Sequence, residues 1–165
     1  MKRPRVDRAL PIGVIVLVLV TVVVTRLPHL GTGPLDFDEG VYWLSMRSMR
    51  AGNPLFASVY SSQPPAFLLL SEPVWNWLGG SIAAGRAVMV GWAVLGVGSG
   101  AILGWRLAGP LAGVVVAVAL AVDPRMVNQS IILQADGPAV SLGLLSLAAA
   151  AVAVTVHRPR WRALG

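Results

Sequence analysis

The sequence predicts an all-α fold, a polytopic membrane helical bundle with about four transmembrane helices. Of its 165 residues, 56% are hydrophobic and 12% are charged, and the mean hydropathy is +0.73. These values lie outside the range of ordinary soluble domains. The second observation is a series of apolar runs long enough, or nearly long enough, to cross a hydrocarbon core of about 30 Å. We therefore expect a single membrane domain over residues 1–165.

The predicted spans are four apolar runs, at residues 10–25, 87–105, 107–122 and 137–156. A fifth run, 66–78, is shorter and contains Glu72 and Pro73. We expect it to form a helix at the membrane interface, where the indole of Trp75 suits the headgroup level. The long loop 26–86 is then predicted to carry interfacial helices.

The positive-inside rule gives the expected topology. Basic residues gather before the first span, after the second span and in the tail 157–165: Lys2, Arg3, Arg5, Arg8, Arg106, Arg158, Arg160 and Arg162. Cytoplasmic segments carry an excess of such residues, so both termini are predicted to be cytoplasmic and residues 26–86 extracytoplasmic. A fifth span at 66–78 would export the basic tail. A cleaved signal peptide at 1–28 is disfavoured, because no small-x-small cleavage site follows the apolar run.

Composition also limits the chemistry and the compartment. The absence of cysteine excludes disulfides, thiol chemistry and cysteine zinc sites. The net charge of +6 is explained by arginines that flank the apolar runs, so the expected partner is membrane lipid and not nucleic acid. The preference for arginine over lysine, with abundant Ala, Val and Gly, indicates a bacterial protein. The predicted location is the bacterial inner membrane.

Glycines recur at four-residue spacing in the second predicted span, at Gly96, Gly100 and Gly104. Small residues at this spacing let helices approach closely, so we expect this face to receive further helices from a continuation of the chain or from a partner subunit. The stretch 96–101 also mimics a dinucleotide fingerprint. No strand precedes it and it lies inside a span, which argues against cofactor binding.

Three carboxylates follow the first span, at Asp36, Asp38 and Glu39. Asp36 and Glu39 have the spacing of a capping box at the start of a helix, so a purely structural role is an open alternative for both. Asp38 adds like-charge repulsion that capping does not require. Nearby like charges raise the pKa of a carboxylate, which suits a general base or a metal ligand.

A fourth carboxylate, Asp136, stands at the start of the last apolar run. Gly137 and Pro138 follow it, so it is either the N-cap of a helix or a functional group at the membrane boundary.

Taken in order, these features resemble glycosyltransferase superfamily C. The residues on which the resemblance rests are Asp38-Glu39-Gly40-x-Tyr42 in the first outer loop, Gln63-Pro64-Pro65 before a short helix, Arg86 at the start of a span, and Asp136. The resemblance is closest to the family 39 protein mannosyltransferases and the lipid A aminoarabinose transferases, and it covers residues 10–156. Those enzymes transfer a sugar from a polyprenyl-phosphate carrier to an acceptor protein, lipid or glycan on the outer face of the membrane.

The resemblance implies a role for each matched residue. Asp38 would be the general base, and Glu39 would orient the acceptor or hold a divalent cation. Arg86 or Arg125 would bind the leaving phosphate, because a guanidinium can contact it bidentately. A role as a topology signal or headgroup anchor is the open alternative for each arginine. The residues expected to bind substrate are Tyr42, Gln63, Arg86, Arg125 and Asp136, and Asp38 with Asp136 could hold a divalent cation, Mg²⁺ or Mn²⁺. Relatives often have a basic residue where this chain has Gln63.

Relatives are longer and have eight or more spans, so the chain is expected to be the amino-terminal part of such an enzyme and to be inactive by itself. Missing carboxy-terminal helices or a partner subunit would complete it. Two alternatives stay open: a non-catalytic membrane scaffold that keeps the fold, and a transporter fragment. A transporter would carry acids near the middle of its spans, and the predicted spans contain none.

Overall fold

The computed structural model describes residues 8–156, which form an all-α bundle. The elements are α1 (Ala9–Arg26), the 3-10 turn η1 (Leu27–His29), α2 (Phe37–Arg50), α3 (Pro65–Trp77), α4 (Ile82–Ala108), α5 (Pro110–Val122), α6 (Pro124–Gln129) and α7 (Asp136–Val156). Extended structure in this part of the chain is limited to a bridge between Leu55 and Val59. The predicted tail and the basic residues before Arg8 lie outside the described residues.

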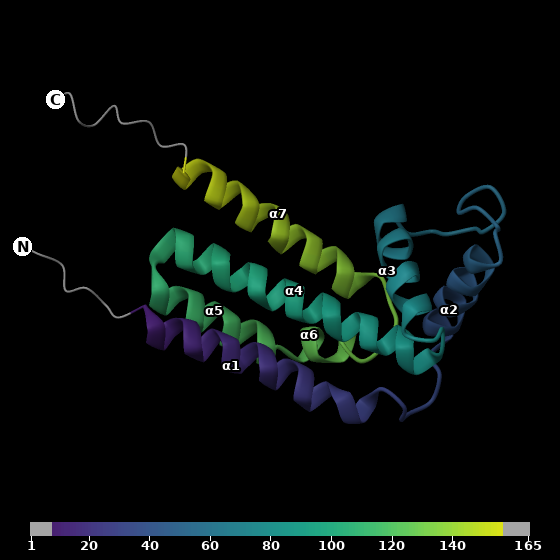
Figure 1. The fold of residues 1–165 in the computed structure, drawn as a ribbon, viewed down its shortest axis with the longest axis horizontal. Helices are drawn as coiled ribbons and strands as arrows, with labels where there is room; N and C mark the ends of the chain where they lie inside the picture. The colour runs from purple at the N-terminus through teal and green to yellow at the C-terminus, as the bar shows by residue number, and fades with distance from the viewer. Residues whose placement is uncertain (1–7, 157–165) are drawn as a thin grey trace, which may run out of the picture.

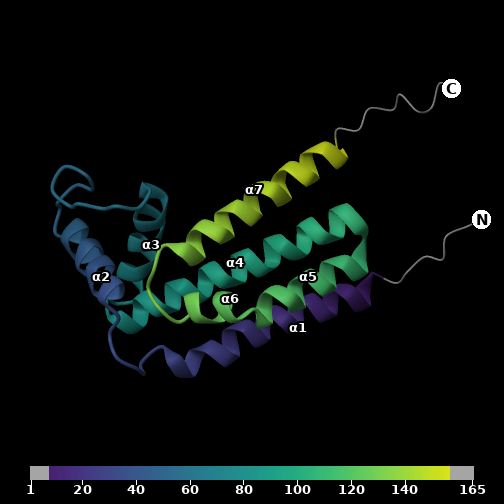
Figure 2. The same ribbon diagram turned by 180° about the vertical axis from the view of Figure 1, so that it is seen from behind.

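Helices α1, α4, α5 and α7 lie side by side and alternate in direction (Figures 1 and 2). Helix α4 is central and contacts α1, α3, α5 and α7. The start of α1 and the end of α7 lie at one end of the bundle, and α2 and α3 lie at the other end. The polar loop expected between the first two spans therefore forms a helical cap on one end.

Three helical segments are long and apolar enough to cross a membrane: Ala9–His29, Ile82–Ala108 and Asp136–Thr155. The third predicted span, 107–122, is shorter than expected, because Gly109 (φ 96°) ends α4 and α5 begins at Pro110. Helix α5 has 13 residues, which gives a length of about 20 Å at 1.5 Å per residue. This length is below the roughly 30 Å of a bilayer core.

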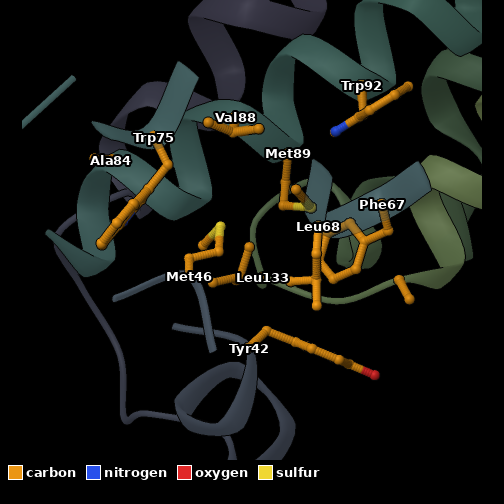
Figure 3. Packing of buried hydrophobic residues seen from close by; sticks show 11 residues of the cluster. Tyr42, Met46, Phe67, Leu68, Trp75, Ala84, Val88, Met89, Trp92 and Leu133 are labelled. Atoms are coloured by element: carbon orange, nitrogen blue, oxygen red, sulfur yellow. The ribbon is translucent and has the colours of Figure 1, made fainter. Parts of the chain in front are cut away.

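The run 66–78 forms a helix, as predicted, and it packs on α2 and α4. A cluster of buried side chains joins the three helices, with Met46 from α2, Leu68 and Trp75 from α3, and Met89 from α4 (Figure 3). Each of these four side chains is at most 1% exposed. Burial of large apolar side chains contributes roughly 1.5–3 kcal/mol each, so α2 and α3 are anchored to the bundle.

The glycine face of α4 has a different partner from the one predicted. A Cβ at Gly96 would meet Ser141 of α7, and a Cβ at Gly104 would lie 2.9 Å from the Ala112 carbonyl oxygen of α5. The close approach was predicted correctly. The expectation that further helices would fill this face is wrong, because α5 and α7 of the same chain already occupy it.

We expect Gly104→Ala to lower the free energy of unfolding by about 1–3 kcal/mol, since the added methyl group meets the backbone of α5 and the helices must separate. The matched control is Gly98→Ala in the same helix, where no atom lies within 4 Å of the added Cβ. That variant should be neutral or gain up to about 1 kcal/mol from helix propensity. Unfolding in mixed micelles measures both, and equal stabilities would contradict the packing.

Candidate functional site

A buried ion pair joins the start of α2 to the start of α4. Arg86 Nε donates to Glu39 Oε1 at 2.8 Å, and Arg86 Nη2 donates to Glu39 Oε2 at 2.7 Å. Glu39 is 0% exposed and Arg86 is 5% exposed. The two hydrogen bonds form a bidentate pair, the strongest arrangement of these groups.

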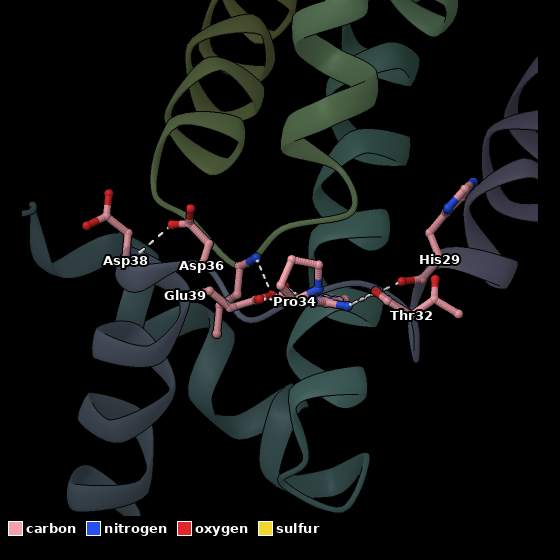
Figure 4. Close-up of polar contacts among 8 residues, drawn as sticks. His29, Thr32, Pro34, Asp36, Asp38 and Glu39 are labelled. Carbon is pink, nitrogen blue, oxygen red and sulfur yellow. Dashed lines mark hydrogen bonds and ion pairs between the residues drawn. The ribbon is translucent and has the colours of Figure 1, made fainter.

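The remaining donors and acceptors of the pair bind backbone. Arg86 Nη1 donates to the carbonyl oxygens of Thr32 and His29, and Nη2 donates to that of Pro34 at 3.3 Å (Figure 4). Glu39 Oε1 also accepts from the Leu133 N–H at 3.1 Å. The pair therefore ties together α2, α4, η1 with the loop that follows it, and the loop before α7.

The hydrogen bonds keep Glu39 ionised in spite of its burial. Burial alone would raise the pKa of Glu39, but the hydrogen bonds from Arg86 and the Leu133 N–H, the charge of Arg86 and the backbone of Asp36 together hold it below its ordinary value. Because Glu39 is 0% exposed and accepts these hydrogen bonds, its carboxylate does not reach the surface where a substrate would bind. In this structure, two residues expected to act on substrate, Glu39 and Arg86, bind each other.

Asp36 is the N-cap of α2, as its spacing predicted. Its Oδ1 accepts from the Asp38 N–H at 3.0 Å. An aspartate in this position satisfies a backbone donor that the helix itself leaves unpaired. Figure 4 shows Asp36 and Asp38 directed away from the buried pair, and Asp38 is exposed.

A second set of predicted residues meets around Tyr42. The ring of Tyr42 is buried edge-on against Phe67, with ring centroids 5.0 Å apart, and its hydroxyl points out of the hydrophobic cluster (Figure 3). Burial and the charges of Asp38 and Asp136 raise the pKa of Tyr42, and a hydrogen bond with the Gln63 side chain opposes the rise.

We call Asp38, Tyr42, Gln63 and Asp136 the Tyr42 group. Asp38 and Tyr42 are four residues apart on one helix and thus share a face. Gln63 comes from the loop before α3, and Asp136 from the start of α7. The structure thus brings together four of the seven residues predicted to form the site.

One predicted detail differs at Asp136, and Arg125 lies apart from the other predicted residues. Asp136 is the first residue of α7 rather than its N-cap, and it is exposed there. A carboxylate in the first turn still interacts favourably with the helix dipole. Arg125 is exposed on α6, and within residues 8–156 no hydrogen bond or ion pair joins its side chain to Glu39, Arg86 or the Tyr42 group.

A metal ion bound near the Tyr42 group would have few ligands from the protein. The described residues contain no group of three or more His, Cys, Asp or Glu side chains arranged to hold a metal ion. A divalent cation at Asp38 and Asp136 would need its remaining oxygen ligands from water or from a substrate phosphate. Mg²⁺ is often bound in that way.

Sequence reasoning missed Arg26, which is 6% exposed at the end of α1. Its guanidinium donates to Ser130 Oγ at 3.2 Å, to Thr25 Oγ1 at 2.7 Å and to the Ala121 carbonyl oxygen at 2.8 Å. An arginine that flanks an apolar run is usually a topology signal, and the pattern contains nothing that separates such an arginine from a buried one.

No protein-family model, curated protein or solved structure matches the chain. The function is therefore inferred from the geometry of the site and from the motifs quoted above.

We expect Arg86→Leu to lower the free energy of unfolding by about 3–5 kcal/mol, because it leaves Glu39 buried without its counterion. Glu39→Gln should be similarly costly, since Arg86 is then the unpaired charge. The double variant Glu39→Gln/Arg86→Leu should lose less than the sum of the single losses. Additive losses would show that the pair is not coupled.

The same pair gives a pH dependence as a second readout. The pKa of Glu39 is lowered in the folded chain, so its contribution to stability is complete above the unfolded pKa and is lost as pH falls through the folded pKa. Wild-type stability should therefore fall below about pH 4, and the fall should be smaller in the double variant.

Proposed function

We propose that the chain is a membrane glycosyltransferase, or the amino-terminal part of one, that transfers a sugar from a polyprenyl-phosphate carrier to an acceptor at the outer face of the membrane. One observation supports this most directly: the exposed carboxylates of Asp38 and Asp136, from helices about 100 positions apart in the sequence, both lie near enough to the Tyr42 hydroxyl for their charges to raise its pKa, at one end of an apolar bundle. A group transfer at a membrane surface needs polar chemistry in this position.

In the proposed reaction, the Asp38 carboxylate takes the proton from the acceptor hydroxyl. The acceptor oxygen then bonds to the anomeric carbon of the sugar, and the bond from that carbon to the carrier phosphate breaks. The carrier leaves as a phosphate that has gained negative charge. Gln63 and Tyr42 would orient the acceptor by hydrogen bonds, and Asp136 would do so as a second carboxylate.

The leaving phosphate needs positive charge. Arg86 could supply it only after releasing Glu39, which is costly for a buried pair. Exposed Arg125, or a divalent cation held by Asp38 and Asp136, would meet the phosphate without that cost. We therefore propose that Arg86 serves mainly to hold Glu39, and with it α2, in position in the proposed enzyme.

We further propose that the chain lies in the bacterial inner membrane with the Tyr42 group outside and both termini in the cytoplasm. At the end formed by α2 and α3, large aromatic side chains are exposed, among them Trp77 at 83% and Tyr60 at 85%. Aromatic residues of this kind favour the headgroup region. Arg8 and Arg106 lie at the opposite end, as the positive-inside rule requires.

A second candidate is a non-catalytic membrane module that keeps the fold. The observation that favours it is the bidentate pair itself, because Glu39 and Arg86 are then structural residues in a position where the resembled enzymes place functional ones. Loss of activity on removal of Asp38 separates the two candidates.

The topology is tested with single cysteines in the cysteine-free chain. Ser62→Cys and Asn128→Cys are expected to react with an impermeant maleimide on intact cells, and Leu107→Cys is not, although all three positions are exposed in the structure. Lysed cells provide the control in which all three react. Labelling of Leu107→Cys on intact cells would reverse the proposed orientation.

We expect Asp38→Asn to lower sugar transfer in membranes by about 10²–10⁴-fold, the usual effect of losing a general base. The assay follows labelled sugar from polyprenyl-phosphate donors into acceptor at equal protein abundance. The matched control, Asp36→Asn, removes the same charge two residues away but retains an N-cap, since asparagine caps as well as aspartate. Equal turnover in wild type and Asp38→Asn would refute the assignment of the base.

A further inference from the structure

A groove runs between α1 and α5 on the lateral surface of the bundle. It has a volume of about 470 Å³ and is lined along most of its length by apolar side chains such as Val18, Val22 and Val118. At one end it reaches Arg26 and His29. An elongated apolar groove with a cation at one end matches the shape and polarity of one lipid chain with its headgroup.

Arg26 is the cation, and its charge has no counterion among residues 8–156. Its three hydrogen-bond partners, Ser130, Thr25 and the Ala121 carbonyl, are all neutral. The described part of the chain contains one ion pair, and that pair is Glu39–Arg86. Asp123, two residues beyond Ala121, is engaged elsewhere, since its Oδ1 accepts from the N–H groups of Arg125 and Met126 at 3.0 and 2.9 Å.

A charge buried in this way is costly unless an anion neutralises it. The hydrogen bonds above use three of the five N–H groups that a guanidinium carries, so donors remain for a ligand in the groove. His29 shares the same end, and its ring is turned away from Glu39 (Figure 4). The remaining walls are apolar, and a lipid tail fits them better than a water-soluble anion.

A second groove lies beside Arg8 and Arg106. Its arginines differ from Arg26 in exposure, and this difference indicates which groove needs an anionic ligand. The second groove is larger, at about 690 Å³, but both of its arginines are exposed at the end of the bundle. Water can solvate those cations. Arg26 is 6% exposed, so solvation by water cannot compensate its charge in the same way.

We propose that the groove between α1 and α5 binds one anionic membrane lipid, with its phosphate at Arg26 and one acyl chain along Val18, Val118 and Val122. The lipid would act as the missing counterion and would fasten α1 to α5 and α6. This site lies between different helices from those of the Tyr42 group, and the proposal does not depend on the proposed glycosyl transfer.

The test uses the purified full chain in neutral detergent with dioleoyl phosphatidylglycerol as the probe. Native mass spectrometry counts the lipids retained, and thermal unfolding reports the stabilisation. The wild type should retain one phosphatidylglycerol and should be stabilised by it. Dioleoyl phosphatidylcholine, which has the same tails and no net charge, should bind at least about tenfold more weakly.

Two variants probe the two halves of the site. Arg26→Gln should weaken phosphatidylglycerol binding by about tenfold or more. Val118→Trp should weaken it comparably by filling the groove while leaving Arg26 in place; Val118 is 41% exposed, so the substitution does not overpack the core. The charge-matched control is Arg50→Gln, an exposed arginine on α2, which should bind like the wild type.

The outcomes separate lipid from free phosphate. Stabilisation by glycerol phosphate equal to that by phosphatidylglycerol would identify a soluble anion site and overturn the proposal. Wild-type retention by both Arg26→Gln and Val118→Trp, or equal binding of the two dioleoyl lipids, would also overturn it. If Arg26→Gln does not fold in detergent, Val118→Trp alone decides, because it keeps every hydrogen bond of Arg26.

Discussion

The buried pair of Glu39 and Arg86 is the interaction on which the rest of this end of the molecule depends. It lies where α2, α4 and two loops converge, and every partner of the two side chains belongs to one of those four segments or to η1. Removing one charge would leave the other without compensation in an apolar environment. Helix α2, which covers this end of the bundle, is thereby held in a fixed position.

The pair also determines how the neighbouring residues are presented. Successive residues on an α-helix are separated by about 100°, so a helix that directs Glu39 inward turns Asp38 toward its flank. Tyr42 follows Asp38 by four residues and lies on the same flank. Asp136 reaches this flank because the loop that precedes α7 is bound to Glu39 through the Leu133 N–H. The Tyr42 group is thus positioned by the buried pair of Glu39 and Arg86.

Features that depend on local sequence were predicted well. The N-cap at Asp36 and the helix that begins at Pro65 follow from residues within one turn, and the structure contains both. The break that shortens α5 was also visible, at Gly109 and Pro110, but a count of apolar residues alone did not register it.

Features that depend on distant partners could not be predicted in the same way. The spacing of Glu39 matched a capping box, yet its main partner is 47 residues away at Arg86 and another is 94 residues away at Leu133. The glycine face of α4 was correctly expected to pack closely. Which helix would fill it depended on the path of the chain between α4 and α7, and no pattern within α4 contains that information.

The two buried arginines affect how the charge pattern is to be interpreted. A positive-inside count treats each arginine near a span as solvated, and Arg26 and Arg86 would then weigh against an outer position for the end where they lie. Both side chains are buried, with 6% and 5% exposure, and bind within the protein. They therefore carry little topological information. Arg8 and Arg106, which are exposed next to long helices at the opposite end, do carry such information.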